Sequence, residues 1–395
     1  MSLNRDPYLP ASGAADQAPT IVVKPSPQTS VIKIALGVAA ILIALLLGLL
    51  VLLLIGIETG PVALLVGLVT ASVPVPIYIV LVLWVDRYES EPIWMLATAF
   101  FWGALVAVFF AFLFNTATGL LVTGLTNSRN AGETFAAVIS APIVEETAKA
   151  VILFIFFFWK KDEFDGVIDG IVYAALVGLG FAMTENIQYY GKAMMEGGGE
   201  KLTVILIIRG AFAPFSHPLF TSMTGIGLGL ARQTRNTAVK VITPIVGLLV
   251  AICMHSIWNG SAVIFGGLGF LVTYLIVMVP AFVIILIVII LALRWEGQVV
   301  RQFLMTDFER GLLTKDEYDQ LGTIRGRMGS SFNAFSGGGL ERWRLRMRLN
   351  QLASELAFHR SRVSRGVCSS KQDVVEREMA YLQALENLLQ KVRFR

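Results

Sequence analysis

The chain has 395 residues, of which 55% are hydrophobic and only 15% are charged, and its formal net charge is +4. Soluble globular domains carry roughly a quarter charged residues. This composition therefore excludes an ordinary soluble protein and predicts a protein that crosses a membrane several times.

The N-terminal segment, residues 1–33, is predicted to be a disordered tail, because it has too few apolar side chains to offset the entropy of ordering the chain. After it come eight stretches that each hold about twenty mostly apolar residues, the length that a helix needs to cross the hydrocarbon layer. The prediction is an all-α, polytopic membrane bundle of about eight spans over residues 34–294. The stretches are 34–57, 61–84, 93–115, 136–159, 167–190, 202–231, 241–265 and 269–293.

The sixth stretch contains Pro214 and Pro218. Proline lacks the amide hydrogen and clashes with the preceding turn, so this span is predicted to be kinked or broken. Unwound backbone at membrane depth is tolerated only where it lines a cavity inside the protein. The prolines therefore indicate a cavity beside the sixth span.

Lysine and arginine are unevenly distributed between the loops, and cytoplasmic loops carry the excess of both. The loops on one side hold only Arg129, Lys192 and Lys201. We therefore expect a multi-pass plasma-membrane protein with both termini in the cytoplasm. The basic residues on the other side are Lys24, Lys33, Arg87, Lys160, Lys161, Arg232, Arg235, Lys240 and Arg294.

From Trp295 onward the composition becomes charged and polar, and residues 295–395 are predicted to form a cytosolic helical extension. The predicted segments are a helix from the capping-box pair Thr314 and Glu317 to about Arg327, a Gly/Ser-rich linker at 330–339, and helices at about 340–365 and 371–392.

Four arginines alternate with other residues in this extension, and two interpretations of them stay open. They could form a solvated helix face, or they could contact anionic lipid of the inner leaflet at about 1 kcal/mol per residue. Because the arginines alternate and do not line one stripe, the solvated face is favoured, and no nucleic-acid partner is expected. These residues are Arg342, Arg344, Arg346 and Arg348.

Ionisable side chains inside the predicted spans are the main indication of function, because charges at membrane depth are costly and default to functional sites. Lys149 lies three and four residues after Glu146 and Glu145, so it can face either carboxylate on one helix. With 1.5 Å of rise per residue, the candidates share a depth band between the midplane and the outer surface. The candidates are Glu145, Glu146, Glu185, His217, His255 and Asn259.

This set of side chains suits hydrolysis. A carboxylate can act as general base for water, and imidazole or amide groups can stabilise an oxyanion. Alternatively, His217, His255 and Glu185 could bind zinc and leave a position open for water. No HExxH motif is present, so a divalent metal and a metal-free glutamate mechanism stay equally open. A proton-coupled secondary transporter, with the carboxylates as a relay, is the alternative function.

Four motifs follow one another on consecutive predicted spans. They are Glu145-Glu146-x-x-Lys149, Phe181-x-x-x-Glu185-Asn186, Ser216-His217-Pro218 and His255-x-x-x-Asn259. In this order, within 136–260, they resemble the PrsW family of intramembrane proteases, which is similar to the CAAX prenyl-protease superfamily. The resemblance implies cleavage of membrane-anchored proteins, such as anti-sigma factors, near the extracytoplasmic side.

The resemblance also implies roles for these residues. Glu145 would be the base, Glu146 and Glu185 would orient water or a metal, and Lys149 would hold the glutamate pair. The oxyanion or metal would be bound by His217, His255 and Asn259, with Asn186 in support.

Structural roles are the alternatives for several of these residues. Glu146 and Lys149 could form an ion pair that fixes helix packing, and the Asn186 side chain could form a hydrogen bond between helices. Arg209 is predicted to be a partner for Glu185 or for a loop acid. Asp165 and Asp169 are predicted to be helix-start residues.

Overall fold

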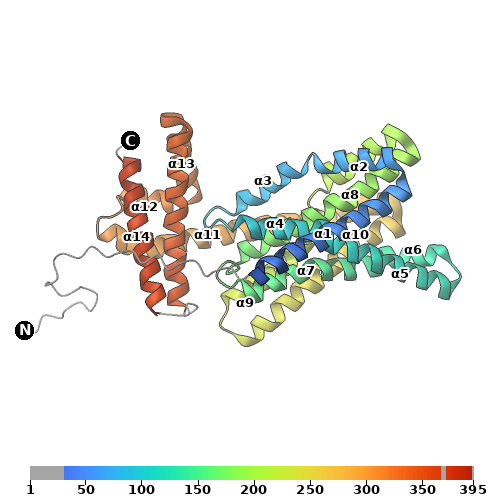
Figure 1. The fold of residues 1–395 in the computed structure, drawn as a ribbon, viewed down its shortest axis with the longest axis horizontal. Coiled ribbons are helices and arrows are strands. Elements are labelled where there is room, and N and C mark those ends of the chain that lie inside the picture. Colours follow the sequence, from blue (N-terminus) through green and yellow to red (C-terminus); the bar gives the residue numbers. More distant parts are fainter. Residues whose placement is uncertain (1–30, 366–370, 394–395) are drawn as a thin grey trace, which may run out of the picture. The chain divides into compact units, whose positions relative to one another are not determined.

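The computed structural model describes residues 31–365 and 371–393, and every regular element in these ranges is helical (Figure 1). The predicted all-α, polytopic bundle is confirmed. The predicted disorder of the N-terminal tail falls on residues 1–30, which lie outside the described ranges, and on residues 31–33, which belong to the first helix. The chain divides after Ile43 into two units, and residues 31–43 of the first helix are exposed apolar surface for the most part.

The helices follow one another with four short π-helical segments, η1 to η4, between them. They are α1 (Val31–Thr59), α2 (Pro61–Ser72), α3 (Val75–Val85), α4 (Ile93–Phe101), η1 (Trp102–Ala107), α5 (Val108–Thr126), α6 (Arg129–Phe135), η2 (Ala136–Ser140), α7 (Ala141–Trp159), α8 (Val167–Leu206), η3 (Ile207–Phe212), α9 (Ser216–Gln233), α10 (Thr237–Thr273), η4 (Tyr274–Met278), α11 (Val279–Glu309), α12 (Lys315–Leu321), α13 (Ile324–Ser364) and α14 (Lys371–Arg393).

Five helical stretches of the described chain are long and apolar enough to cross a membrane, compared with eight predicted. The last two run for 67 and 73 residues, and breaks at Gly197–Gly198 and Gly266 divide them where the predicted spans meet. The predicted fourth span is not among the five, since its helix α7 carries three ionisable residues. The five stretches are Val31–Thr59, Pro61–Val85, Ile93–Thr126, Val167–Gln233 and Thr237–Glu309.

The predicted break in the sixth span is confirmed. The π-helical segment η3 ends at Phe212, and α9 begins at Ser216 with Pro218 in its first turn. The first four amide groups of a helix have no intrahelical partner, so proline is tolerated there. The break places His217 at the start of α9, within the membrane region.

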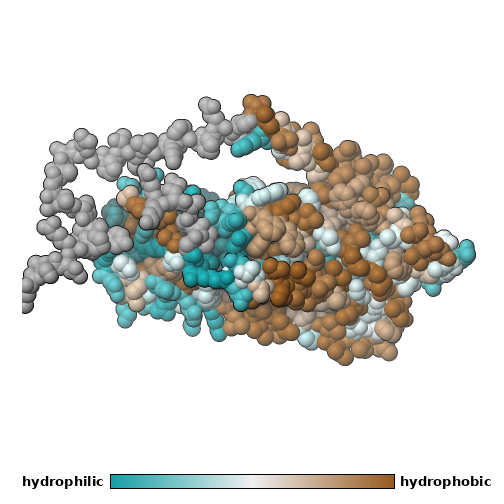
Figure 2. All heavy atoms as spheres, turned by 90° about the horizontal axis from the view of Figure 1, so that it is seen from below, coloured by the Kyte–Doolittle hydropathy of each residue, from teal (hydrophilic) through white to brown (hydrophobic). Residues whose placement is uncertain are grey.

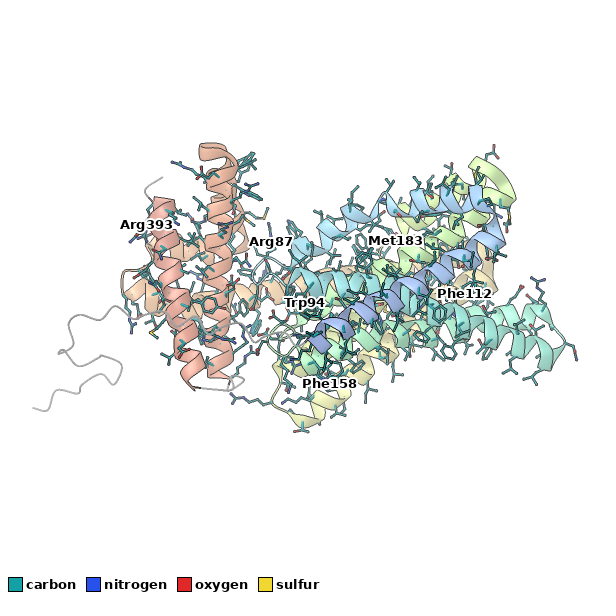
Figure 3. The ribbon with its side chains drawn as sticks, viewed as in Figure 1. Arg87, Trp94, Phe112, Phe158, Met183 and Arg393 are labelled. Carbon is teal, nitrogen blue, oxygen red and sulfur yellow. The ribbon has the colours of Figure 1, made fainter. Side chains whose placement is uncertain are left out.

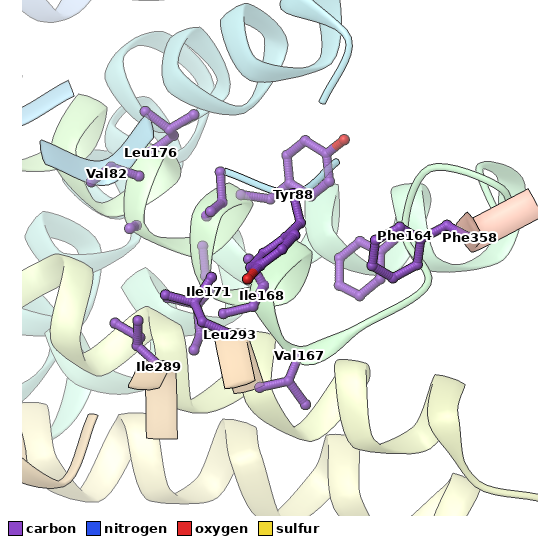
Figure 4. Close-up of a cluster of buried hydrophobic side chains, with 14 of the residues drawn as sticks. Val82, Tyr88, Phe164, Val167, Ile168, Ile171, Leu176, Ile289, Leu293 and Phe358 are labelled. Atoms are coloured by element: carbon purple, nitrogen blue, oxygen red, sulfur yellow. The ribbon is translucent and has the colours of Figure 1, made fainter. Parts of the chain in front are cut away.

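Helix α8 forms the centre of the bundle, and its residues 167–182 are buried without exception. Its N-terminal half packs in an apolar cluster with side chains of α11 and of the segment after α3 (Figure 4). The residues labelled there include Ile168, Ile171, Leu176, Ile289, Leu293 and Tyr88.

Glycines let α8 and α9 approach each other closely. A Cβ atom on Gly170 would lie 2.2 Å from the carbonyl oxygen of Gly225, and one on Gly178 would lie 2.6 Å from the nitrogen of Pro218. Small residues at such crossings allow backbone-to-backbone packing inside a membrane. This contact fixes α8 against the first turn of α9, where His217 lies.

Gly178→Ala should therefore destabilise the protein by about 1–3 kcal/mol, the usual cost of overpacking. The added methyl group would also meet the carbonyl carbon of His217 at 2.7 Å. Gly199→Ala, in the same helix but with nothing within 4 Å of the added atom, is the matched control. Unfolding in detergent micelles measures both variants, and equal midpoints would contradict the packing argument.

The C-terminal part of the chain differs from prediction at three places. Helix α11 continues through Trp295 to Glu309, so the change of composition falls inside a helix. The capping box is confirmed, since the Glu317 amide donates to Thr314 Oγ1 at 3.3 Å, but that helix ends at Leu321, six residues early.

The predicted linker at 330–339 is wrong. Helix α13 covers these residues and is interrupted only at Gly338–Gly339, where Gly339 has φ +65°. The two arms of α13 contact each other through Asn350 Nδ2, which donates to Ser331 Oγ at 3.2 Å. This tertiary contact keeps the Gly/Ser-rich arm helical. The predicted last helix is confirmed as α14.

Candidate functional site

Four helices bring the predicted ionisable residues together. Glu145, Glu146 and Lys149 project from α7, Glu185 from α8, His217 from α9 and His255 from α10. All but Glu185 are buried, and the side chain of Glu185 is 19% exposed. The shared depth band predicted from the sequence therefore corresponds to one cluster of contacting side chains.

The ammonium group of Lys149 is the centre of this cluster. Its Nζ lies 2.8 Å from Glu146 Oε1 and 3.5 Å from Glu145 Oε2, and it is fully buried. It also lies 3.0 Å from His217 Nδ1 and 3.8 Å from the centre of the Phe181 ring. Lysine carries only donors, so His217 Nδ1 must accept this bond.

Glu146 is fully buried and has a partner for each oxygen. Its Oε2 accepts a hydrogen bond from Thr221 Oγ1 at 2.9 Å, and its Oε1 lies 3.1 Å from His255 Nδ1. An ionised carboxylate only accepts, so Nδ1 of His255 carries the proton and Nε2 of the neutral ring keeps its lone pair. Glu146 thus holds His255 in one orientation.

Glu145 faces a different environment. It lines a cavity of about 640 Å³ that α5, α7 and α8 border, together with part of α1. Its Oε1 is 3.4 Å from Asn115 Nδ2, while its buried Oε2 accepts no hydrogen bond from the described residues. Oε2 forms ion-pair contacts with Lys149 Nζ and, at 3.9 Å, with His255 Nε2.

Glu185 is held from two sides. Its Oε2 lies 2.9 Å from His217 Nε2 and accepts a hydrogen bond from the Arg209 guanidinium. Arg209 Nε also donates to Asn186 Oδ1 at 2.5 Å. The predicted pairing of Arg209 with Glu185 is confirmed, and Asn186 supports that arginine.

Three donor groups of the described chain lie close enough to share a metal ion. The ligand atoms of Glu145, His217 and His255 are all within 4.8 Å of one another. Glu145 takes the place that the sequence analysis gave to Glu185, whose carboxylate is occupied by Arg209. His217 contacts Lys149 through Nδ1 and Glu185 through Nε2, so binding a cation would replace one of these contacts.

Asn259 has a backbone partner. Its Nδ2 donates to the carbonyl oxygen of Ala137 at 2.9 Å, in the π-helical turn η2 that leads into α7. In the structure this amide therefore connects α10 to the start of the helix that carries the glutamate pair.

A polar chain on α5 and η2 was not predicted from the sequence. Thr118 Oγ1 donates to Ser140 Oγ at 2.8 Å, and Ser140 Oγ donates to Asn115 Oδ1 at 2.9 Å. Asn115 then reaches Glu145, as described above. The available signal was a set of hydrogen-bonding side chains in otherwise apolar stretches. Thr221 was missed too, although it follows His217 by one helical turn.

Asp169, in the first turn of α8, has the predicted helix-start role, whereas the Asp165 carboxylate pairs with Arg362 and Arg365. Asp169 Oδ2 accepts hydrogen bonds from the amides of Asp165 and Gly166 at 2.8 and 2.7 Å. These bonds satisfy free donors at the start of the helix.

Comparison with known proteins gives one family. The family model described as PrsW family intramembrane metalloprotease matches residues 91–285. Protease PrsW of Geobacillus kaustophilus is 35% identical over 147 residues, which are 37% of this chain and 58% of that relative. No solved structure matches.

Two further relatives are matched over more of their length. Protease PrsW of Oceanobacillus iheyensis is 31% identical over 171 residues, 43% of this chain and 71% of the relative. Protease PrsW of Bacillus subtilis is 31% identical over 175 residues, 44% of this chain and 72% of the relative.

Proposed function

This chain belongs to the PrsW family of intramembrane proteases, and from that premise we propose that it hydrolyses a peptide bond in the membrane-embedded part of a membrane-anchored protein. The observation that carries the proposal is the state of Glu145. One oxygen of this buried carboxylate has no hydrogen-bond donor among the described residues, and the residue lines a cavity large enough for a peptide segment.

In the proposed reaction, Glu145 takes a proton from a water molecule in the cavity, and the resulting hydroxide attacks the scissile carbonyl. His255, held by Glu146, has its Nε2 3.9 Å from Glu145 Oε2. Glu145 can release the proton taken from water to His255 Nε2, and His255 can then pass a proton to the leaving amine. Lys149 stabilises negative charge on both glutamates during these transfers.

The residues present fit a divalent cation such as zinc, and we include it in the proposal. Glu145 Oε2 is a buried carboxylate oxygen that accepts no hydrogen bond from the described residues. His217 and His255 each offer a ring nitrogen, and these ligand atoms lie within 4.8 Å of one another and of the Glu145 carboxylate. A neutral imidazole whose other nitrogen contacts a carboxylate is a usual metal ligand. When bound, such an ion would supply Lewis-acid polarisation of the scissile carbonyl.

The proposed substrate is a membrane-anchored protein of the anti-sigma-factor type, cut near the extracytoplasmic side, as the family resemblance implies. The proposed topology has both termini in the cytoplasm of a plasma-membrane protein, because the basic residues follow α3, α7 and α9. The proposal predicts that hydrolysis becomes much slower when Glu145 loses its charge.

Metal analysis of the purified chain tests the cation. Wild-type protein is expected to hold about one zinc ion per chain, since three protein ligands make a catalytic site, and His255→Ala should lose it. Gln188→Ala, at the edge of the same cavity, is the control that should keep the metal. If purified wild-type protein held no metal and still cleaved its substrate in the presence of chelators, the proposed cation would be contradicted. Glu145 would then act as the base without a metal.

A further inference from the structure

The two arms of α13 carry an exposed apolar stripe that nothing in the proposed protease reaction uses. Its members recur every three or four residues on each arm, so they lie on one face of each helix. Phe332, the most exposed of them, is 69% accessible. The stripe, called here the α13 stripe, consists of Met328, Phe332 and Phe335 on the first arm and Leu340, Trp343 and Met347 on the second.

The base of this hairpin is anchored to the loop between α3 and α4. Arg327 is buried, and its guanidinium donates to the carbonyl oxygen of Arg87 at 3.3 Å and to Ser354 Oγ at 2.5 Å. It also stacks 4.2 Å from the centre of the Tyr88 ring. One side chain thus joins both arms of α13 to the end of α3.

The α13 stripe faces that same loop across a groove of about 730 Å³. Arg87 and Ser90 of the loop line this groove, as do all six members of the stripe and the neighbouring Arg344 and Arg348. Figure 2 shows hydrophilic surface on the C-terminal helices and mainly apolar surface over the rest of the described bundle.

Tryptophans mark the membrane surface at these helix ends. Trp94 lies at the start of α4, with Lys160 Nζ 5.0 Å from its ring centre, and Arg87 lies 4.6 Å from the ring of Trp84 (Figure 3). Exposed tryptophan beside lysine or arginine is typical of the headgroup level of a bilayer. The exposed tryptophans at this end are Trp84, Trp94, Trp159 and Trp295.

The charge around the stripe has one sign. Residues 322–350 contain six arginines and one glutamate, a balance of 6 − 1 = +5. Arg342, Arg344 and Arg348 are exposed, whereas Arg346 is buried and donates to Gln320 Oε1 at 2.8 Å. Of the four arginines for which the sequence favoured a solvated helix face, Arg346 is the one that is buried.

We propose that the α13 stripe lies in the headgroup region of the bilayer, with its exposed arginines on anionic lipid. Apolar and aromatic side chains flanked by arginine are the chemistry of an interfacial helix, and basic residues near an anionic leaflet add to its attraction. The hairpin then holds the cytosolic ends of α3 and α4 at a fixed depth. This role is independent of peptide hydrolysis.

The test uses the full chain in lipid nanodiscs, with Cys253→Ser and Cys368→Ser so that one introduced cysteine carries a fluorophore. Phe335→Cys reports on the stripe, and Asn387→Cys, exposed on α14, is the matched control. A headgroup-labelled quencher lipid is included in discs of zwitterionic lipid alone or with about a third of anionic lipid.

Quenching at position 335 is expected to exceed that at position 387 by about twofold or more in anionic discs. Arg344→Glu combined with Arg348→Glu should lower it towards the value in zwitterionic discs. Equal quenching at both positions would overturn the proposal. So would a label at 335 that is protected from quencher and cross-links to a second copy, because the stripe would then be a protein interface.

Discussion

Glu145→Gln is expected to lower the rate of peptide cleavage by about 10²- to 10⁴-fold, the contribution of a general base. Glutamine keeps the size of the side chain and can keep the contact with Asn115, but it cannot take a proton from water. The carboxylate oxygen concerned accepts no hydrogen bond from the described residues, so the change breaks no hydrogen bond there and removes only the charge that lies 3.5 Å from Lys149 Nζ. Cleavage of a membrane-anchored substrate by purified protein in proteoliposomes measures the effect.

Two comparisons make this result specific. Glu196→Gln, on α8, changes an exposed glutamate whose ion-pair partner in the described chain is exposed Lys201, and it should retain the wild-type rate. The Glu145→Gln protein should also insert and unfold like the wild type. If it cleaved at the wild-type rate, Glu145 would not be the base.

Lys149→Met should destabilise the folded protein by about 3–5 kcal/mol, since removing one partner of a buried ion pair leaves uncompensated charge. Methionine fills a similar volume but leaves Glu146 without its 2.8 Å partner. It also removes the donor to His217. The loss should appear in unfolding curves recorded in detergent micelles.

The matched control is Lys192→Met, which breaks an ion pair of 2.7 Å with Glu58 whose two side chains are 37% and 42% exposed. Exposed pairs contribute about 0–1 kcal/mol. Adding Glu146→Gln to Lys149→Met should recover part of the stability, because the two residues are in contact and their effects are coupled. Similar midpoints for Lys149→Met and Lys192→Met would show that the buried pair contributes no more than a surface one.

The positions of many helices and helix breaks could be predicted, because they depend on the lengths of apolar stretches and on prolines, which are local features of the sequence. The break before α9 followed from Pro214 and Pro218, and the start of α12 followed from Thr314 and Glu317. The Gly/Ser-rich arm of α13 could not be predicted, because contacts with the other arm, distant in sequence, hold it in a helix.

The residues that form the cluster around Lys149 could be predicted, because charged side chains are costly to bury in a membrane. The contacts between these residues could not be predicted. The spacing of residues along the chain does not show which glutamate, Glu145 or Glu185, has a carboxylate that is available beside the two histidines. The Arg209 guanidinium donates a hydrogen bond to the Glu185 carboxylate, so Glu145 is the glutamate that is available. Asn115 was missed because its contact with Glu145 joins two helices that no local pattern relates.

The most direct measurement compares the membrane-protein fragments of cells that contain equal amounts of wild-type and Glu145→Gln protein. The account predicts new chain ends inside or beside membrane spans, near the extracytoplasmic side, that occur only with the wild type. Identical fragment sets, together with proton or substrate flux that depends on Glu145, would contradict a protease and favour a transporter.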